Sequence, residues 1–370
     1  MTAAQLSNPR RRVLVMAGGT GGHVFPGLVV AERLQAANID VSWLGTRRGI
    51  ESKLVPDSGI PINYLSVEGL RGRGFLALLK APLMLLRALV QAWLILSEVK
   101  PQVVLGMGGF ASGPGGVAAR IRRIPLVIHE QNSVAGTTNK MLAIIATKVL
   151  QAFPNSLPEA ECCGNPVRAE IAAIAAPQQR FAERRTPVKM LVLGGSRGAL
   201  ALNKLIPQAL AILPPENRPQ VLHQTGEIHL AATEEIYRQM NFDLNDQQLQ
   251  RVAFIDKMQQ AYAWADFVIC RSGALTVAEL TSVGLASLLI PFPYAIDDHQ
   301  TTNGELLVNC GAARLVQERD LSAQQLAEQI QYFCQSSERR LSMALAARSL
   351  AKNHAAERVA AVCREVACGE

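Results

Sequence analysis

The stretch "VLVMAGGTGGHVFPGLVVAERL", residues 13–34, decides which fold class the chain can adopt. An apolar run of strand length leads into four glycines within five positions, and a run with a helical pattern follows. Glycine loses more backbone entropy on folding than any other residue, so such a cluster marks a tight turn or a close approach of backbone to another group. A strand, a glycine turn and a helix in this order predict the opening of a βαβ unit.

The same pattern returns later in the chain. Apolar runs alternate with helical patterns up to about residue 132, and the strand-glycine-helix opening restarts in "PVKMLVLGGSRGALALNKL", residues 187–205. Strands with few polar positions are typical of parallel sheets that helices cover on both faces. A length of 370 residues fits two domains. We therefore expect an α/β fold of two Rossmann-like, doubly wound parallel-sheet domains.

The stretch "ECCGNPVR", residues 161–168, is interrupted by glycine and proline and is the expected domain boundary. The predicted domains are residues 1–165 and residues 166–370. The alanine-rich helical stretch from Leu321 is expected to close the second domain. Whether its last helix packs back on the first domain stays open.

Composition indicates a folded protein with an anionic partner. Hydrophobic residues make up 49% and charged residues 18%, while the net charge is +7. A basic chain favours nucleic acid, phosphorylated substrate or acidic lipid, but only 5% of residues are aromatic, which weakens the nucleic-acid interpretation. The seven cysteines lack a C-x-x-C spacing, and the N-terminus lacks a signal-peptide core. These features favour a reducing cytoplasm over export.

An apolar segment, "FLALLKAPLMLLRALVQAWLIL" at residues 75–96, raises the question of a membrane. It is long enough to span a bilayer, but two basic residues, a proline and a glutamine interrupt it, so a spanning helix is not expected. Two interpretations remain. The segment forms an amphipathic core helix pair, or it presents a helix surface to the membrane interface beside Arg71 and Arg73.

Four glycine-containing turns precede predicted helices, at residues 18–22, 106–109, 194–198 and 272–273. A turn between a strand and a helix presents backbone N–H groups at the positive end of the helix dipole, which suits phosphate or developing negative charge. The alternative is that glycine serves only close strand-helix packing. No G-x-x-x-x-G-K-[ST] loop occurs, which argues against an ATPase.

One of these turns supports a rival interpretation. "GMGGFA", residues 106–111, reads G-x-G-x-x-A, and Glu130 lies near the acidic position of a dinucleotide-binding fingerprint. A nicotinamide-dependent oxidoreductase is therefore an alternative, although it leaves the other three turns unexplained. A noncatalytic membrane-associated scaffold is a third.

His23 follows the first glycine turn, where the first helix is expected to begin. A helix N-terminus favours the neutral imidazole, which is the form that a general base needs. His23 is therefore the candidate catalytic residue, and the alternative is a structural hydrogen-bonding role.

Nine segments together resemble one family. In chain order they are "GGTGGHVFPGLVVAERL", "GLRGRG", "VLGMGGFASGPGGVAA", "IHEQNSVAGTTNK", "GNPVR", "LVLGGSRGALALN", "FID", "ADFVICRSGALTVAEL" and "PFPYAIDDHQTTN". They are spread over most of the chain. They resemble the peptidoglycan glycosyltransferases that move N-acetylglucosamine from UDP-N-acetylglucosamine to undecaprenyl-diphospho-N-acetylmuramoyl-pentapeptide (lipid I), forming lipid II.

The resemblance implies a GT-B fold, with two Rossmann-like domains facing a deep cleft, and inverting transfer to the 4-hydroxyl of the acceptor. By this likeness residues 1–165 would bind the acceptor and associate with the membrane, and residues 166–370 would bind the nucleotide sugar. It implies no metal and no cofactor, in keeping with the absence of a D-x-D triplet. It implies a peripheral position on the cytoplasmic face of the inner membrane, anionic lipid as a further partner, and a part in cell-wall biogenesis, cell shape and cell division. Other cell-wall synthesis proteins are candidate partners, and nucleic acid is not.

The resemblance also implies roles for single residues. Thr20, Gly21 and Gly22 would lie near the donor sugar and the acceptor diphosphate, with Asn132 and Arg168 in the donor site. Ser196 would face the donor diphosphate, Ile255 would contact uracil through its backbone, and Gln300 would contact the sugar. The phosphate and ribose would be held by Ala274, Leu275, Thr276, Val277, Ala278 and Glu279.

Two positions depart from the family pattern. Arg197 stands where glutamine is common, and Glu227 stands where lysine is common. The first adds positive charge near the donor diphosphate and the second removes it, so their effects on donor affinity oppose each other.

Overall fold

The computed structural model describes residues 11–66, 75–182, 186–195 and 198–369, with side chains described for all of these except 75–81 and 296. Arg71, Arg73, Ser196 and Arg197 lie outside the described residues. The chain divides into two compact units, residues 1–167 with 353–370 and residues 168–352. The boundary falls between Val167 and Arg168, against the expected division after residue 165.

The first unit contains a seven-stranded sheet in the order β3-β2-β1-β4-β5-β6-β7, and every neighbouring pair is parallel. Its strands are β1 (Arg12–Ala17), β2 (Asp40–Thr46), β3 (Ile62–Leu65), β4 (Val103–Gly108), β5 (Leu126–Glu130), β6 (Lys148–Gln151) and β7 (Glu161–Cys162). Its helices are α1 (Gly21–Ala36), α2 (Glu51–Asp57), α3 (Phe75–Val99), α4 (Ser112–Ile121), α5 (Thr137–Ala143) and α15 (Ala355–Cys368).

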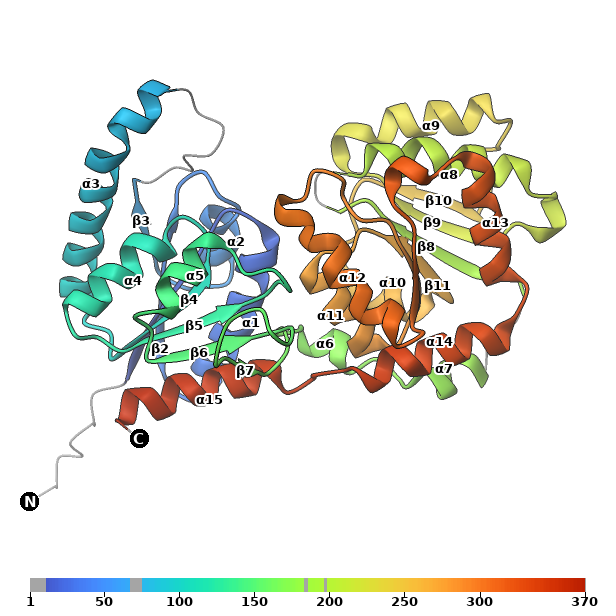
Figure 1. The fold of residues 1–370 in the computed structure, drawn as a ribbon. Helices are drawn as coiled ribbons and strands as arrows, with labels where there is room; N and C mark the ends of the chain where they lie inside the picture. The colour runs from blue at the N-terminus through green and yellow to red at the C-terminus, as the bar shows by residue number, and fades with distance from the viewer. Residues whose placement is uncertain (1–10, 67–74, 183–185, 196–197, 370) are drawn as a thin grey trace, which may run out of the picture. The chain divides into compact units, whose positions relative to one another are not determined.

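Both faces of this sheet are buried, because successive side chains of a strand point to opposite faces. Val13 and Val15 of β1 belong to a core shared with α1 and α15, whereas Leu14 and Met16 belong to a core shared with α3 and α4. Figure 1 shows α1 and α15 on one side of the sheet and α3 and α4 on the other. The predicted parallel sheet with helices on both faces is confirmed.

The last helix, α15, belongs to the first unit, although the expected division at residue 165 would give it to the second domain. Its buried stripe includes Val359, Val362 and Cys363, and these side chains complete the core on the α1 face of the first sheet. Burial of this apolar stripe is the physical reason for the return of the chain to the first unit.

The second unit contains a six-stranded parallel sheet in the order β10-β9-β8-β11-β12-β13. Its strands are β8 (Lys189–Leu193), β9 (Gln220–Gln224), β10 (Leu249–Val252), β11 (Phe267–Cys270), β12 (Ala286–Leu289) and β13 (Ala313–Leu315). Its α-helices are α6 (Ala169–Ala172), α7 (Pro177–Ala182), α8 (Leu200–Ile212), α9 (Leu230–Gln239), α10 (Met258–Trp264), α11 (Ala274–Val283), α12 (His299–Asn309), α13 (Ala323–Cys334) and α14 (Ser337–Ser349). Short 3₁₀ helices are η1 (Pro215–Asn217), η2 (Glu227–His229), η3 (Ile296–Asp298) and η4 (Glu318–Asp320).

The apolar segment at residues 75–96 lies in one continuous helix, α3, and not in a helix pair. Its inner face places Ala88, Ala92 and Leu96 in the core beside α4, and its outer face leaves leucines exposed. By length and composition alone, the part of α3 from Pro82 to Val99 would suffice to cross a membrane. Its packing against α4 and β3 makes it an amphipathic helix of the first unit.

Candidate functional site

The first glycine turn, between β1 and α1, is held against the turn that follows β4. A Cβ atom on Gly109, whose φ is +85°, would lie 2.4 Å from the carbonyl oxygen of Gly18. Gly19 also has a positive φ, of +90°, which only glycine adopts without strain. The close packing that the sequence analysis offered as one role of these glycines is therefore observed. They also leave the first backbone N–H groups of α1 at the carboxyl edge of the sheet, where binding of an anion stays a prediction.

A buried carboxylate, that of Glu51, holds this turn in place. Its Oε2 accepts a hydrogen bond from the Gly19 backbone N–H at 2.9 Å, and its Oε1 accepts from the backbone N–H of Thr46 at 2.9 Å and the Thr46 hydroxyl at 2.8 Å. Glu51 is fully buried. Glu51 could not be predicted from the sequence, because a glutamate at the start of a short helix gives no local signal that its side chain reaches a turn 32 positions earlier.

His23 lies in the first turn of α1, as predicted, and Thr20 is its neighbour. The Thr20 hydroxyl oxygen is 3.3 Å from Nδ1 of His23. A Cβ atom on Gly108 would lie 2.9 Å from Cδ2 of His23, so glycine at that position makes room for the ring. The structure therefore brings Thr20, Gly21, Gly22 and His23 together at one helix N-terminus, with the imidazole half-buried.

The loop after β5 contains Asn132 and is organised by Glu130. Oε1 of Glu130 accepts hydrogen bonds from the Asn132 backbone N–H at 2.9 Å and from its side-chain amide at 3.4 Å. Oε2 accepts from the Gly136 backbone N–H at 3.1 Å and from the Asn139 amide at 2.9 Å. Glu130 is buried, and these donors from the loop and from α5 occupy its carboxylate. It is therefore not available as the ribose ligand that the oxidoreductase alternative needs.

In the second unit, the turn between β8 and α8 is held by the side chain of Gln224. Oε1 of Gln224 accepts from the Gly195 backbone N–H at 3.0 Å, and its Nε2 donates to the carbonyl oxygens of Gly195 and Ala253, both at 3.1 Å. Ile255, the predicted uracil contact, follows Ala253 by two residues and is half-buried. Gln224 thus connects the turn that is expected at the donor diphosphate with the loop that is expected at the uracil. It was not among the predicted site residues.

The third turn of interest precedes α11. Gly273 is the N-cap residue of this helix, and α11 begins at Ala274. Ala274 and Val277 are buried, whereas Leu275, Thr276 and Ala278 are half-buried. The first backbone N–H groups of a helix have no intrahelical acceptor, so this helix start can bind an anion.

The structure brings two predicted donor ligands, Arg168 and Glu279, into contact with each other. Nη2 of Arg168 donates to Oε1 of Glu279 at 3.3 Å, and the hydroxyl of Tyr262 donates to Oε2 at 2.9 Å. Burial raises the pKa of the Glu279 carboxyl above its ordinary value, while Arg168 and Tyr262 act to lower it. Tyr262 was not among the predicted site residues.

Gln300 lies near the start of α12, and its Oε1 accepts a hydrogen bond from the Phe292 backbone N–H at 3.0 Å. Its amide group keeps two N–H donors for a further partner. Among the described residues, no group of three or more histidine, cysteine, aspartate or glutamate side chains is arranged to hold a metal ion.

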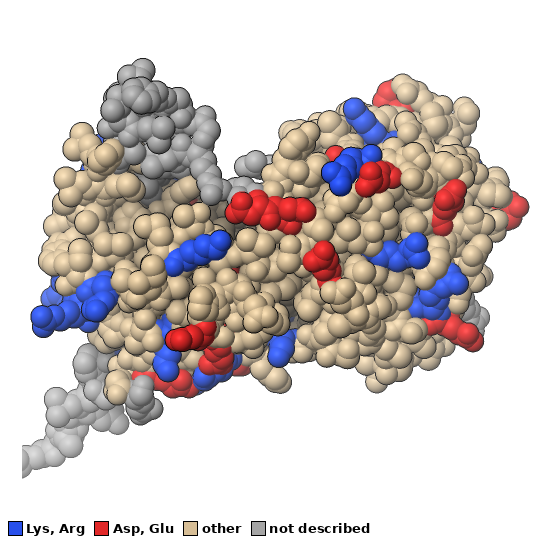
Figure 2. Space-filling model, viewed as in Figure 1, with Lys and Arg blue, Asp and Glu red and all other residues tan. Residues whose placement is uncertain are grey.

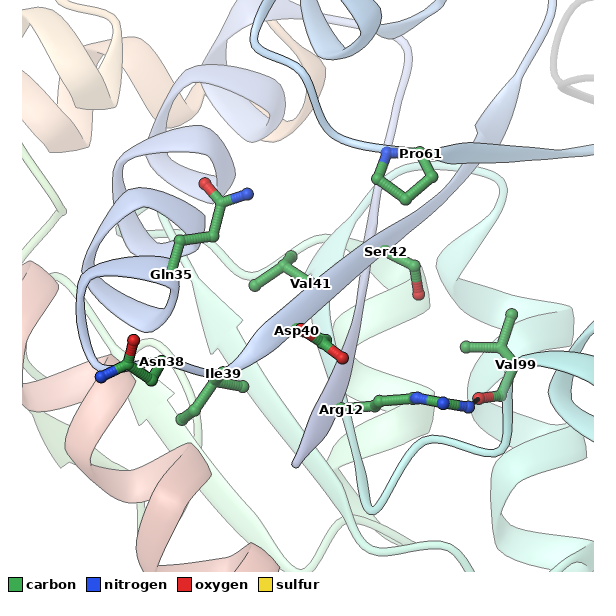
Figure 3. Close-up of a pocket in the computed structure, with 9 residues that line it drawn as sticks. All are labelled: Arg12, Gln35, Asn38, Ile39, Asp40, Val41, Ser42, Pro61 and Val99. Atoms are coloured by element: carbon green, nitrogen blue, oxygen red, sulfur yellow. Dashed lines mark hydrogen bonds between the residues drawn. The ribbon is translucent and has the colours of Figure 1, made fainter. Parts of the chain in front are cut away.

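A pocket of about 540 Å³ in the first unit lies elsewhere (Figure 3). Arg12, Asp40 and Pro61, which line it, lie at the amino ends of β1, β2 and β3. Ligands of open parallel sheets bind outside the carboxyl ends of the strands. This pocket contains none of the predicted site residues and is not the candidate site.

Each of the two units has a parallel sheet with glycine turns and helix N-termini at its carboxyl edge, and the structure matches the GT-B fold. Matches to two family models make the chain a glycosyltransferase. Residues 13–151 match the glycosyltransferase family 28 N-terminal domain, and residues 189–359 match the glycosyltransferase family 28 C-terminal domain. The chain belongs to this family and, within it, to the MurG proteins.

The relatives carry one common description, UDP-N-acetylglucosamine–N-acetylmuramyl-(pentapeptide) pyrophosphoryl-undecaprenol N-acetylglucosamine transferase. The protein of Paraburkholderia xenovorans is 52% identical over 359 residues, which cover 97% of this chain and 96% of the relative. That of Burkholderia vietnamiensis is 53% identical over 358 residues, which cover 97% of each chain. The crystal structure of Acinetobacter baumannii MurG is similar, with a TM-score of 0.82, 37% identity and coverage of 96% of this chain and 99% of that one.

Proposed function

We propose that this protein transfers N-acetylglucosamine from UDP-N-acetylglucosamine to lipid I and so forms lipid II for peptidoglycan synthesis. The observation that carries the proposal is the similarity over 97% of the chain to transferases described by that donor and acceptor. The turns that precede α8 and α11 support a nucleotide-sugar site in the second unit, because helix N-termini attract a diphosphate.

In the proposed reaction, a ring nitrogen of His23 accepts the proton from the 4-hydroxyl of the acceptor sugar. The oxygen then attacks the anomeric carbon of N-acetylglucosamine, the bond from that carbon to the UDP oxygen breaks, and the configuration inverts. UDP leaves as an anion, stabilised by the N-termini of α8 and α11 and by Arg168. Nη2 of Arg168 already donates to Glu279. A guanidinium has five N–H donors, so the remaining donors of Arg168 can bind the departing UDP.

The test is transfer of radiolabelled N-acetylglucosamine from the UDP donor to a lipid I analogue, with EDTA present. We expect labelled lipid product and saturable binding of UDP-N-acetylglucosamine. Absence of both would overturn the proposal. A parallel titration with NADH addresses the oxidoreductase alternative, and we expect no binding.

We further propose that α3 attaches the protein to the cytoplasmic face of the inner membrane without crossing it. The outer face of the helix exposes Leu83 at 72%, Leu86 at 57% and Leu94 at 61%, with Arg87 also exposed. In Figure 2 the part of the surface around α3 that is not drawn in grey is mostly uncharged, with basic side chains at its lower end. An apolar helix face beside basic residues suits the interface of an anionic bilayer, where a polyprenyl-linked acceptor resides.

Sedimentation with vesicles tests this attachment. A variant with Leu86→Ser and Leu94→Ser should pellet less with vesicles that contain anionic lipid than the wild type does. The matched control is Leu200→Ser with Ile212→Ser, which changes two similarly exposed side chains of α8 in the second unit and should pellet like the wild type. Equal sedimentation of all three folded proteins would rule out α3 as the attachment site.

A further inference from the structure

The hydroxyl of Tyr262 lies in a buried polar cluster of the second unit. Tyr262 comes from α10 and is buried, and its hydroxyl donates a hydrogen bond to Oε2 of Glu279 on α11 at 2.9 Å. Burial raises the pKa of Tyr262 well above 10.0, so the hydroxyl keeps its proton and remains a donor. Glu279 is buried as well, with only 7% of its surface exposed.

Glu279 is held from two sides. Arg168 donates to Oε1 at 3.3 Å, and Tyr262 donates to Oε2. An ionised carboxylate offers about four lone-pair positions. These two donors therefore fix the plane of the carboxylate and leave about two acceptor positions for a ligand with two adjacent hydroxyl groups.

We propose that Tyr262 is a positioning residue for the nucleotide ribose: its hydroxyl holds the Glu279 carboxylate in the orientation that accepts hydrogen bonds from both ribose hydroxyls. The inference rests on the proposed function and on the ribose contact that the family resemblance implies for Glu279. Tyr262 touches no substrate and acts through Glu279. The ring of Tyr262 packs in the core, so replacement by phenylalanine removes only the hydrogen bond.

The experiment compares binding of UDP and 2′-deoxy-UDP to the wild type, Tyr262→Phe and Tyr237→Phe. Tyr237 is a matched control, because it is also fully buried in the second unit and its hydroxyl hydrogen-bonds with Nδ1 of His223 at 3.0 Å. In Tyr262→Phe we expect UDP to bind about tenfold more weakly, as for loss of a hydrogen bond to a charged group. We also expect the preference for UDP over 2′-deoxy-UDP to fall. Tyr237→Phe should keep the wild-type preference.

Turnover supplies a second readout. With Tyr262→Phe, the KM for UDP-N-acetylglucosamine should rise about tenfold, while kcat at saturating donor and the KM for the lipid acceptor stay near their wild-type values. If the wild type prefers UDP to 2′-deoxy-UDP and Tyr262→Phe keeps the same preference, the positioning role of Tyr262 is overturned and the proposed function is not. Equal loss of preference in both phenylalanine variants would also overturn the positioning role. A wild type that binds no UDP would overturn the proposed function, and the inference with it.

Discussion

The two units hold their first glycine turns with different chemical groups. In the first unit, the Glu51 carboxylate accepts from the Gly19 backbone N–H. In the second unit, the Gln224 amide bonds with both the N–H and the carbonyl oxygen of Gly195. Both side chains are buried, and each reaches its turn from another part of the chain.

The difference is one of charge. A carboxylate accepts hydrogen bonds but donates none, and it places a negative charge behind the turn that carries His23. An amide satisfies Gly195 without a charge, so the second turn keeps its attraction for a diphosphate. The comparison predicts that the first turn serves turnover and that the second serves donor affinity.

The largest effect is expected from His23→Ala. Loss of a general base should lower kcat about 100-fold or more, with little change in the KM for the donor. Transfer assays with the lipid I analogue measure both constants. His354→Ala, which removes an exposed histidine at the start of α15, should keep wild-type turnover. Full turnover by His23→Ala would show that His23 is not the base. The prediction that the first turn serves turnover would then be wrong.

Glu51→Gln should destabilise the first unit. The new amide group would direct an N–H donor at the N–H of Gly19 or of Thr46, and a buried donor without an acceptor costs about 1–3 kcal/mol of the free energy of unfolding. Urea denaturation measures this loss. Glu32→Gln, an exposed change on α1, should cost less than about 0.5 kcal/mol. If the two variants prove equally stable, the Glu51 carboxylate does not hold the turn.

Gln224→Glu should give the second turn a charge like that of the first. The negative charge should repel the donor diphosphate and weaken UDP binding about tenfold, which corresponds to about 1.4 kcal/mol. Calorimetric titration with UDP measures the affinity. Gln220→Glu is the matched control, because Gln220 lies at the opposite end of the same strand, β9, and should leave UDP binding unchanged. Unchanged binding by Gln224→Glu would show that charge behind the turn is immaterial.

The smallest effect is expected from a feature that the two units share, a buried histidine on an interior strand of the sheet. Burial lowers the pKa of His223 to about 3 and also lowers that of His129. Below pH 6.5 the unfolded chain therefore binds protons that the folded chain does not, so stability falls as the pH falls. For His223 the loss between pH 6.5 and 5.5 is about 1 kcal/mol. Denaturation at the two pH values should show a smaller loss in His223→Gln than in the wild type, and an equal loss would contradict this assignment.

Much of the fold could be predicted from the sequence, because the relevant signals are local. Apolar runs of strand length indicated buried parallel strands, and glycine clusters indicated the turns that follow β1, β4 and β8. The continuous helix α3 was harder to predict, since a proline and polar residues suggested an interruption that the helix accommodates at Pro82. The return of α15 to the first unit was not predicted from the sequence. Periodicity shows that this helix has an apolar stripe, but not which of the two sheets offers the apolar face that buries the stripe.

The sequence by itself determined the class of fold and the positions of the glycine turns, and it placed His23 at the start of α1. The ligand positions that the family resemblance implies stay predictions. Only the tertiary structure decided which polar side chains meet. Glu51 reaches Gly19 across 32 positions, Gln224 reaches Gly195 across 29, and Arg168 reaches Glu279 across 111. Backbone preference and hydrophobic periodicity act between near neighbours in the chain, whereas these contacts form because buried polar groups need partners, and packing of the sheets selects which partners come within reach.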